Sequence, residues 1–221
     1  MAVFSSDIRE IMNVTNINCV LDVGANVGQF GRFLRDEGFS GTLISFEPIA
    51  SVYSELSRAT VKEPDWYCRR TALGESDGIA EINVSKNYVS SSLLTANAWS
   101  VSIEEGIAEL NREIVPLHRL ETIWSELPIP SLNASIMLKI DVQGLELQVL
   151  RGLGDRVSEI TLFLLEASLI PVYEGEPKFE DVVAELRAIG LHPVWIGPGW
   201  SNKHTRQVFQ CDIVFARRSV L

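Results

Sequence analysis

The chain has few cysteines and no long uninterrupted apolar run. Its 221 residues include three cysteines, Cys19, Cys68 and Cys211, which lie far apart, each in an apolar stretch. This spacing favours buried reduced thiols in a cytoplasmic protein over a disulfide framework or a CxxC metal pair. The most apolar stretch, residues 160–170, is interrupted by Glu166 and is too short to span a bilayer. The sequence therefore predicts no membrane insertion.

Basic residues are also scarce. The chain has 19 Lys and Arg against 29 Asp and Glu, which gives a formal net charge of −10. A field of that sign repels the phosphates of nucleic acids and anionic membrane surfaces. We therefore expect no nucleic-acid partner. The sequence leaves open whether the protein forms a homodimer.

Short β-branched runs alternate with amphipathic segments along most of the chain. Strands are expected at residues 20–23, 43–46, 66–73, 136–142 and 160–165, and helical patterns follow all of these except the third. Alternation of this kind predicts a parallel sheet with helices on both faces. Two further strands, at residues 194–196 and 213–216, have no helix between them, so we expect them to run antiparallel.

Residues 86–118 do not follow the alternation. A strand is expected just before them at 79–84, then a Ser-rich loop at 87–97, a helix at 103–110 and a short strand at 114–117. We interpret 86–118 as an insertion or lid over the active-site side of a single domain that spans residues 1–221.

A glycine-containing turn follows the first expected strand. Asp22, Gly24 and Gly28 form a D-x-G-x-x-x-G pattern that opens into a helix. The dinucleotide pattern G-x-G-x-x-G is not met, because Asn26 and Gln29 occupy its second and third glycine positions. Glycines let a ligand approach the backbone, and a helix N-terminus offers N–H groups to an anion. Asp22 is suited to pair with an ammonium group and the loop N–H groups with a carboxylate, so the turn favours a ligand that ends in an amino acid.

Glu47 ends the second expected strand, 25 positions after Asp22, and Pro48 stops that strand. In doubly wound sheets a carboxylate at this place accepts hydrogen bonds from ribose hydroxyls. The alternative is an acid that stabilises a helix N-terminus. The small residues around Ala72 and Leu73, at the end of the third strand, leave room for an adenine ring to pack against them. A turn without any ligand explains them almost equally well.

Several motifs together resemble the FkbM-type methyltransferases. They run in order from about residue 19 to residue 217 and comprise Leu21-Asp-Val-Gly-Ala-Asn-Val-Gly28, Phe46-Glu-Pro48, Thr71-Ala-Leu-Gly74 with Gly78, Ser91-Ser-Leu93, Leu138-Lys-Ile-Asp-Val-Gln-Gly-Leu-Glu146 and Cys211-Asp-Ile-Val-Phe215. The resemblance implies a Rossmann-like class I methyltransferase fold, with a seven-stranded sheet and a terminal antiparallel strand. It also implies S-adenosylmethionine as methyl donor and O-methylation of a sugar, a glycolipid or another secondary-metabolite precursor.

The resemblance also assigns residues around the donor. It places the methionine end on Asp22, Gly24, Asn26 and Gly28, the ribose on Glu47 beside Pro48, the adenine near Ala72 and Leu73, and the cofactor mouth near Ser91 and Ser92. Two positions depart from the family pattern. Gln143 stands where the family usually has Glu, and Glu121 stands where it usually has Asp.

Candidate catalytic groups lie where strands end, because this fold class binds ligands there. Asp141, which also borders the donor, is the first choice for general base or substrate-orienting acceptor. Lys139 shares its sheet face, so the two side chains should pair and keep Asp141 ionised, unless they form a purely structural ion pair. Glu166 ends the neighbouring strand. Asp141 and Glu166 are the ligands for Mg²⁺ if a metal is used, but Gln143 in place of an acid makes a metal the less favoured interpretation.

His204 is a rival base. It lies in the polar loop 197–210 together with Trp200, Asn202 and Lys203, side chains that suit carbohydrate stacking and hydrogen bonding. Two other functions stay open from the sequence: a nicotinamide-dependent oxidoreductase, which the missing glycines disfavour, and a non-catalytic nucleoside-binding protein. The acceptor and the methylated position are not given by the sequence.

Overall fold

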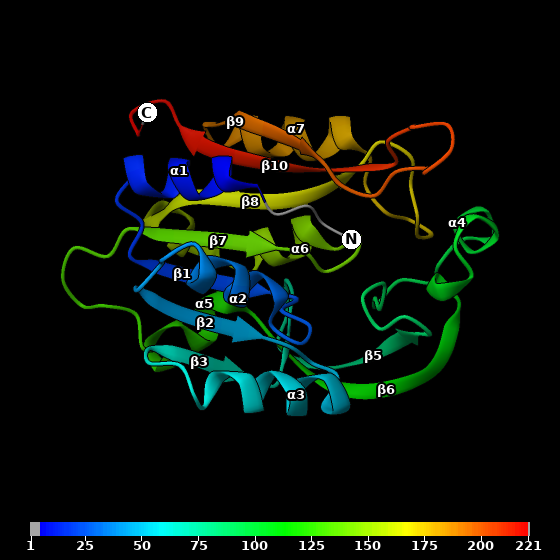
Figure 1. Ribbon diagram of the computed structural model, residues 1–221, viewed down its shortest axis with the longest axis horizontal. Coiled ribbons are helices and arrows are strands. Elements are labelled where there is room, and N and C mark those ends of the chain that lie inside the picture. The colour runs from blue at the N-terminus through cyan, green and yellow to red at the C-terminus, as the bar shows by residue number, and fades with distance from the viewer. Residues whose placement is uncertain (1–4, 221) are drawn as a thin grey trace.

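The computed structural model describes residues 5–220 and contains one large and one small sheet. The large sheet has seven strands in the order β3-β2-β1-β7-β8-β10-β9 (Figure 1). In chain order these strands are β1 (Cys19–Val23), β2 (Thr42–Phe46), β3 (Trp66–Arg69), β7 (Ile136–Ile140), β8 (Ile160–Ser168), β9 (Leu191–Pro198) and β10 (Gln210–Arg217). Strands β3, β2, β1, β7 and β8 are parallel to one another, whereas β10 is antiparallel to both β8 and β9. The predicted parallel sheet and the predicted antiparallel pair at the end of the chain are both confirmed.

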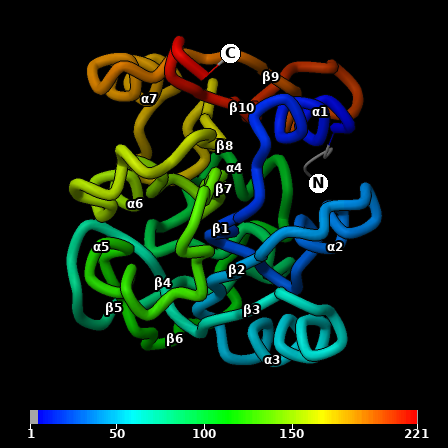
Figure 2. Tube along the Cα trace, turned by 90° about the vertical axis from the view of Figure 1, so that its left-hand side faces the viewer, coloured from blue at the N-terminus to red at the C-terminus, as the bar shows by residue number. Residues whose placement is uncertain are grey.

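Helices cover both faces of this sheet. Figure 2 shows α1 (Ser6–Val14), α2 (Gln29–Asp36) and α3 (Ala50–Thr60) on one side, and α5 (Leu120–Ile123), α6 (Glu146–Arg151) and α7 (Phe179–Ala188) on the other. Short 3-10 helices follow α5 and α6 at Trp124–Glu126 and Gly154–Glu159. The sequence analysis did not predict α1, whose buried Ile8 and Met12 pack on the first face.

Alternation along each strand explains the two cores. On β1, Val20 packs with Phe30 and Leu34 of α2, whereas the next residue, Leu21, joins Leu147 and Leu150 of α6. Successive side chains on a strand point to opposite faces, so a strand that is covered on both sides is apolar except where a buried charge has a partner, as Asp22 of β1 and Lys139 of β7 do. All five residues of β1 are buried, as are all five of β7.

The small sheet has the order β4-β6-β5 and lies beyond the carboxyl ends of the large sheet's parallel strands (Figure 1). It consists of β4 (Ala72–Leu73), β5 (Gly78–Ser85) and β6 (Glu109–His118), and α4 (Ala98–Ile103) with a 3-10 helix (Glu105–Ile107) connects β5 to β6. The loop predicted at 87–97 is present apart from isolated bridges at Ser92 and Ala96.

Two expectations for this region are wrong. No α-helix spans residues 103–110. Ile103 is the last residue of α4, Glu104 is extended, only the short 3-10 helix Glu105–Ile107 follows, and residues from Glu109 onward pair with the end of β5. The strand expected at 66–73 is divided between the two sheets, since β3 pairs with β2 and β4 pairs with β6. Between them, the hydroxyl of Thr71 donates to the Pro116 carbonyl at 3.2 Å and so ties the chain to β6. Pairing with distant residues outweighed the local pattern in both cases.

None of the helices described between residues 5 and 220 has the length and apolarity that crossing a lipid bilayer requires.

Candidate functional site

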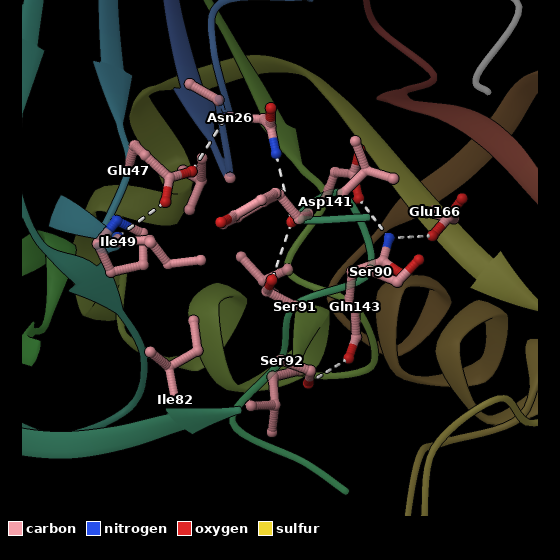
Figure 3. A pocket seen from close by; sticks show the side chains of 18 of the residues that line it. Asn26, Glu47, Ile49, Ile82, Ser90, Ser91, Ser92, Asp141, Gln143 and Glu166 are labelled. Atoms are coloured by element: carbon pink, nitrogen blue, oxygen red, sulfur yellow. Dashed lines mark hydrogen bonds between the residues drawn. The ribbon is translucent and has the colours of Figure 1, made fainter. Parts of the chain in front are cut away.

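A cavity of about 340 Å³ lies at the carboxyl ends of the parallel strands. Its floor comes from residues at or after the ends of β1, β2, β7 and β8. Residues 87–93, which include the Ser90, Ser91 and Ser92 labelled in Figure 3, and Trp200 also line it. Of the residues that the sequence predicted, this cavity is lined by Gly24, Asn26, Glu47, Pro48, Ala72, Leu73, Ser91, Ser92, Lys139, Asp141 and Glu166. Residues far apart in the chain are therefore brought to one place, where a doubly wound sheet binds its ligand.

The turn after β1 is fixed by close backbone packing. Gly24 has φ +74°, and a Cβ atom there would lie 1.8 Å from the carbonyl oxygen of Asp141. Only glycine fits this approach, because any side chain would enter the end of β7. The N–H groups of Gly24 and Ala25 both donate to the Phe46 carbonyl, at 3.1 and 3.0 Å. Those of Asn26, Val27 and Gly28 also donate within the chain, so the turn offers a ligand its shape and side chains more than free N–H groups.

Glu47 is held rigidly at the edge of the cavity. Its side chain is nearly fully buried; Oε1 accepts from the N–H of Ile49 at 2.8 Å and Oε2 from the N–H of Asn26 at 3.0 Å (Figure 3). Burial raises the pKa of Glu47 to about 7, although these two N–H donors act in the opposite direction. Each carboxylate oxygen has a further lone pair, so Glu47 retains the capacity to accept from ligand hydroxyls.

Lys139 contacts β1, the turn after β1 and the loop after β7 beneath the cavity. Its Nζ lies 3.0 Å from Oδ1 of Asp22, 3.1 Å from the carbonyl oxygen of Gly24 and 3.5 Å from Oδ2 of Asp141. Burial alone would lower the pKa of Lys139, but the two carboxylates outweigh it and raise the pKa above its ordinary value. The predicted ion pair between Lys139 and Asp141 is present, and Lys139 forms a second ion pair with Asp22.

Three predicted residues lie outside the cavity wall. Asp22 is fully buried behind Lys139, so the ammonium that it meets belongs to the chain itself. Gly28 is needed for packing, since a Cβ there would approach Leu56 Cδ1 to 2.9 Å. His204 is exposed, and its loop reaches the cavity through Trp200 instead.

Glu166 faces Asp141 across the floor of the cavity. The side-chain amide of Gln143 lies between them, with Nε2 at 2.7 Å from Oδ1 of Asp141 and 2.8 Å from Oε2 of Glu166 (Figure 3). Burial raises the pKa of Glu166 well above its ordinary value, and the nearby carboxylates of Asp141 and Asp212 add to this effect. Among residues 5–220 no group of three or more His, Cys, Asp or Glu side chains is arranged to hold a metal ion.

Glu146 supports the loop after β7 from below. Its Oε1 accepts from the N–H groups of Val142 and Gly144, both at 3.1 Å. Burial raises the pKa of Glu146 to about 8. Glu146 therefore fixes the loop before α6 and does not cap the helix, whose N-cap residue is Leu145 and has no side-chain cap bond.

The sequence analysis missed two polar residues at this site. Gln210 donates to Oε2 of Glu166 at 3.0 Å, and the Tyr173 hydroxyl donates to Oε1 of Gln143 at 2.9 Å. A signal existed for Gln210, because it alternates with Cys211 and shares a strand face with the acidic Asp212. Tyr173 lies in an irregular loop with no periodicity, so no local pattern marks it.

Comparison with known proteins identifies relatives over most of the chain. Residues 22–191 match the family model of the methyltransferase FkbM domain. Methyltransferase 1 of Beauveria bassiana (strain ARSEF 2860) is 28% identical over 193 residues, which cover 82% of this chain and 75% of that protein. Methyltransferase sdnD of Sordaria araneosa is 24% identical over 178 residues, which cover 72% of this chain and 69% of that protein.

Solved structures share the fold at low sequence identity. Methyltransferase FkbM from Methylobacillus flagellatus KT superimposes with a TM-score of 0.52 at 13% identity, over 90% of this chain and 44% of that one. Magnesium protoporphyrin IX methyltransferase (ChlM) from Synechocystis PCC 6803, solved with bound S-adenosylmethionine, has a TM-score of 0.52 at 10% identity, over 96% of this chain and 76% of that one. These neighbours confirm the predicted Rossmann-like class I fold.

Proposed function

The chain belongs to the FkbM methyltransferase family and is an S-adenosylmethionine-dependent methyltransferase, and we propose that it methylates a hydroxyl group of a small molecule. The observation that carries this proposal is the cavity itself. The turn at Gly24, the carboxylate of Glu47 and the carboxylate of Asp141 all line it, so one space adjoins a donor site and a proton acceptor. The nicotinamide oxidoreductase that the sequence left open is not the function of this family.

The donor fits the side of the cavity next to β1 and β2. We assign the methionine end to the turn at Gly24 and Asn26, the ribose hydroxyls to Glu47 and the adenine to the small residues Ala72 and Leu73. The first turn of α2, which begins at Gln29 in the cavity wall, directs the positive end of the helix dipole toward this side of the cavity. Asp22 acts on the donor through Lys139 and the Gly24 carbonyl.

The charges of the cavity favour an uncharged or positively charged acceptor. Among the described residues that line it, Lys139 is the one basic side chain, and Asp22, Asp141 and the Gly24 carbonyl already engage its ammonium group. Four acids, Glu47, Glu104, Asp141 and Glu166, line the same cavity. A phosphorylated or carboxylated acceptor would have no free cation to pair with. A sugar hydroxyl or the hydroxyl of a secondary-metabolite precursor suits this wall, where Trp200 provides an aromatic face.

Methyl transfer is an in-line displacement: the acceptor oxygen bonds to the methyl carbon of the donor as the carbon–sulfur bond breaks and S-adenosylhomocysteine leaves. Alignment of the acceptor oxygen with that methyl group is therefore the main requirement. Asp141 is partly exposed to the cavity, with 29% of its side-chain surface accessible, and takes the proton that leaves the hydroxyl. Lys139 lies beneath Asp141, with Nζ 3.5 Å from Oδ2, and holds that side chain in place. His204, the rival base, is not among the residues of the cavity wall.

The test is transfer of a labelled methyl group from S-adenosylmethionine to a panel of sugars, glycolipids and metabolite alcohols. We expect turnover by the wild type and a loss of about 10²-fold or more in Asp141→Asn, the scale of general base catalysis. Donor binding, measured by calorimetry, should stay within about twofold of wild type, because a loss of less than about 0.5 kcal/mol is expected where only the acceptor side changes.

The matched control is His204→Ala, which should keep wild-type turnover. An unchanged rate in Asp141→Asn would remove it as the base, and loss of rate in His204→Ala alone would transfer that role to His204. Donor binding without turnover over the whole panel would favour the non-catalytic alternative.

A further inference from the structure

Gln143 occupies an unusual place in the catalytic cluster. Its side-chain nitrogen donates at the same time to Asp141, at 2.7 Å, and to Glu166, at 2.8 Å. Its side-chain oxygen lies 2.9 Å from the Tyr173 hydroxyl, a single donor that also has the Ser90 carbonyl oxygen at 2.8 Å. Both the nitrogen and the oxygen of the amide therefore have partners, and the two hydrogens of the nitrogen serve two carboxylate oxygens.

The surroundings set the orientation of this amide. If the nitrogen and oxygen were exchanged, the carbonyl oxygen would face two carboxylates and the nitrogen would face the Tyr173 hydroxyl. An amide oxygen that faces two carboxylates has no hydrogen to donate to them and is repelled. The arrangement with the nitrogen between Asp141 and Glu166 is therefore preferred. Gln210 supports it by donating to the same oxygen of Glu166 at 3.0 Å.

The backbone of Gln143 is equally constrained. Its φ is +61°, a left-handed conformation that a non-glycine residue keeps only when neighbouring contacts enforce it. The Ser92 hydroxyl donates to its carbonyl oxygen at 2.7 Å, and the N–H of the next residue, Gly144, donates to Glu146 at 3.1 Å. The loop thus holds a strained conformation that aims this one side chain between two acids.

Two carboxylates that face each other repel unless a proton, a cation or a hydrogen-bond donor lies between them. A divalent cation such as Mg²⁺ or Mn²⁺ would meet that need with oxygen ligands, but the amide nitrogen offers no lone pair to a metal and fills the place with its hydrogens. We propose that the Gln143 amide is a positioning group that takes the place of a bridging cation between Asp141 and Glu166, so that the cluster holds Asp141 toward the cavity without a metal. This inference rests on the proposed role of Asp141.

The first experiment does not need the acceptor. Mn²⁺ binding is measured by electron paramagnetic resonance on wild type, on Gln143→Glu and on Gln207→Glu, which places the same added charge in an exposed part of the 199–209 loop. Gln143→Glu gives the cluster three carboxylates and should bind one Mn²⁺ at least about tenfold more tightly than the other two proteins, the scale of a changed metal environment.

Two results would overturn the proposal. One is stoichiometric Mn²⁺ binding by the wild type that Asp141→Asn abolishes, because the amide would then share the site with a metal. The other is Mn²⁺ affinity in Gln143→Glu no higher than in Gln207→Glu, because the amide would then not stand where a cation fits.

The second experiment uses an acceptor that turns over in the methyl-transfer panel. The wild-type rate should be unchanged by EDTA, whereas the rate of Gln143→Glu should fall at least about tenfold in EDTA and recover with Mn²⁺. A residue with a purely structural role would not confer recovery by metal. EDTA inhibition of the wild type that Mn²⁺ reverses would contradict the proposal. Because the Mn²⁺ measurement stands alone, failure of the bridge and failure of the methyl-transfer assignment can be told apart.

Discussion

The two walls of the cavity are stabilised by different interactions, one by buried charges and the other by exposed ion pairs. The wall formed by β1, β2 and β7 contains buried charges, and the ammonium of Lys139 lies 3.0 Å from the fully buried Asp22. The wall formed by residues 78–118 is held at its outer surface by exposed ion pairs, such as Arg112 with Glu81 and with Glu109, each at 3.0 Å. Buried pairs cost several kcal/mol when one partner is removed, whereas exposed pairs are worth about 0–1 kcal/mol.

This difference separates what must stay constant from what is free to vary. A donor common to the whole family requires fixed geometry, and the first wall supplies it through buried groups that tolerate little change. Acceptors differ among enzymes of one chemistry, and the second wall can be altered at a smaller loss of stability. We therefore expect substitutions in the first wall to affect folding and donor binding, and substitutions in the second to affect the acceptor alone.

The largest effect should come from Gly24→Ala. The added Cβ would lie 1.8 Å from a backbone oxygen that cannot move without displacing β7, so we expect a loss of more than about 4 kcal/mol in the free energy of unfolding.

Gly38→Ala is the matched control. Gly38 also has positive φ, +79°, but within the described part of the chain no atom lies within 4 Å of the place that its Cβ would take. This control should cost only about 1–2 kcal/mol, from backbone strain alone. Urea denaturation of both variants measures the difference, and equal losses would show that the close approach at Gly24 does not matter.

Lys139→Met should have the next largest effect. It leaves Asp22 buried without a partner, and we expect a loss of about 3 kcal/mol, at the lower end for a broken buried pair because Asp141 is partly exposed. Lys86→Met removes an exposed pair with Glu105 in the second wall and should cost less than about 1 kcal/mol. Thermal and urea unfolding compare the two. Similar losses at the two lysines would abolish the distinction between the walls.

The pH dependence of stability tests Glu47. Its pKa is raised by burial from 4.5 to about 7 in the folded protein, so the folded state holds a proton that the unfolded state releases between these values. The contribution of this proton to the free energy of unfolding is fully present below pH 4.5 and is lost as the pH rises to about 7. In Glu47→Gln the fall in the free energy of unfolding between pH 5 and pH 7.5, measured in urea, should be smaller by about 2 kcal/mol. An unchanged slope would mean that Glu47 does not titrate in this window.

The smallest effect should come from Arg112→Ala in the second wall. Both of its ion pairs are exposed, so we expect a loss of less than about 1 kcal/mol in stability and no change in donor affinity by calorimetry. A loss of donor affinity comparable to that of Glu47→Ala, which should be about 1–3 kcal/mol, would show that the second wall also shapes the donor site.

The same division governs what the sequence could predict. The central strands of the large sheet are buried on both faces and are mostly apolar, so a local pattern such as that of β1 is enough to place them. The strand β6 pairs with β4 and β5, and most of its residues are at least partly exposed, so the sequence predicted a strand only over residues 114–117 and assigned the first two residues of β6 to the helix expected over residues 103–110. Its conformation is set by partners elsewhere in the chain.

Site prediction followed this rule as well. The short motifs around Gly24, Glu47 and Asp141 were found because each lies directly at the end of a central strand. Asp22 and Gly28 belong to those motifs but serve the chain's own packing, a distinction that only the three-dimensional contacts reveal. Tyr173 completes the cluster from an irregular loop and leaves no signal in the sequence.

The most direct measurement of the central claim is a crystal structure with S-adenosylhomocysteine bound. We predict that the ribose hydroxyls lie on the carboxylate of Glu47, that the homocysteine end lies against the turn at Gly24 and Asn26, and that the sulfur atom faces the space in front of Asp141. A product molecule bound elsewhere, or one whose sulfur is turned away from Asp141, would contradict both the donor site and the direction of methyl transfer proposed for this protein.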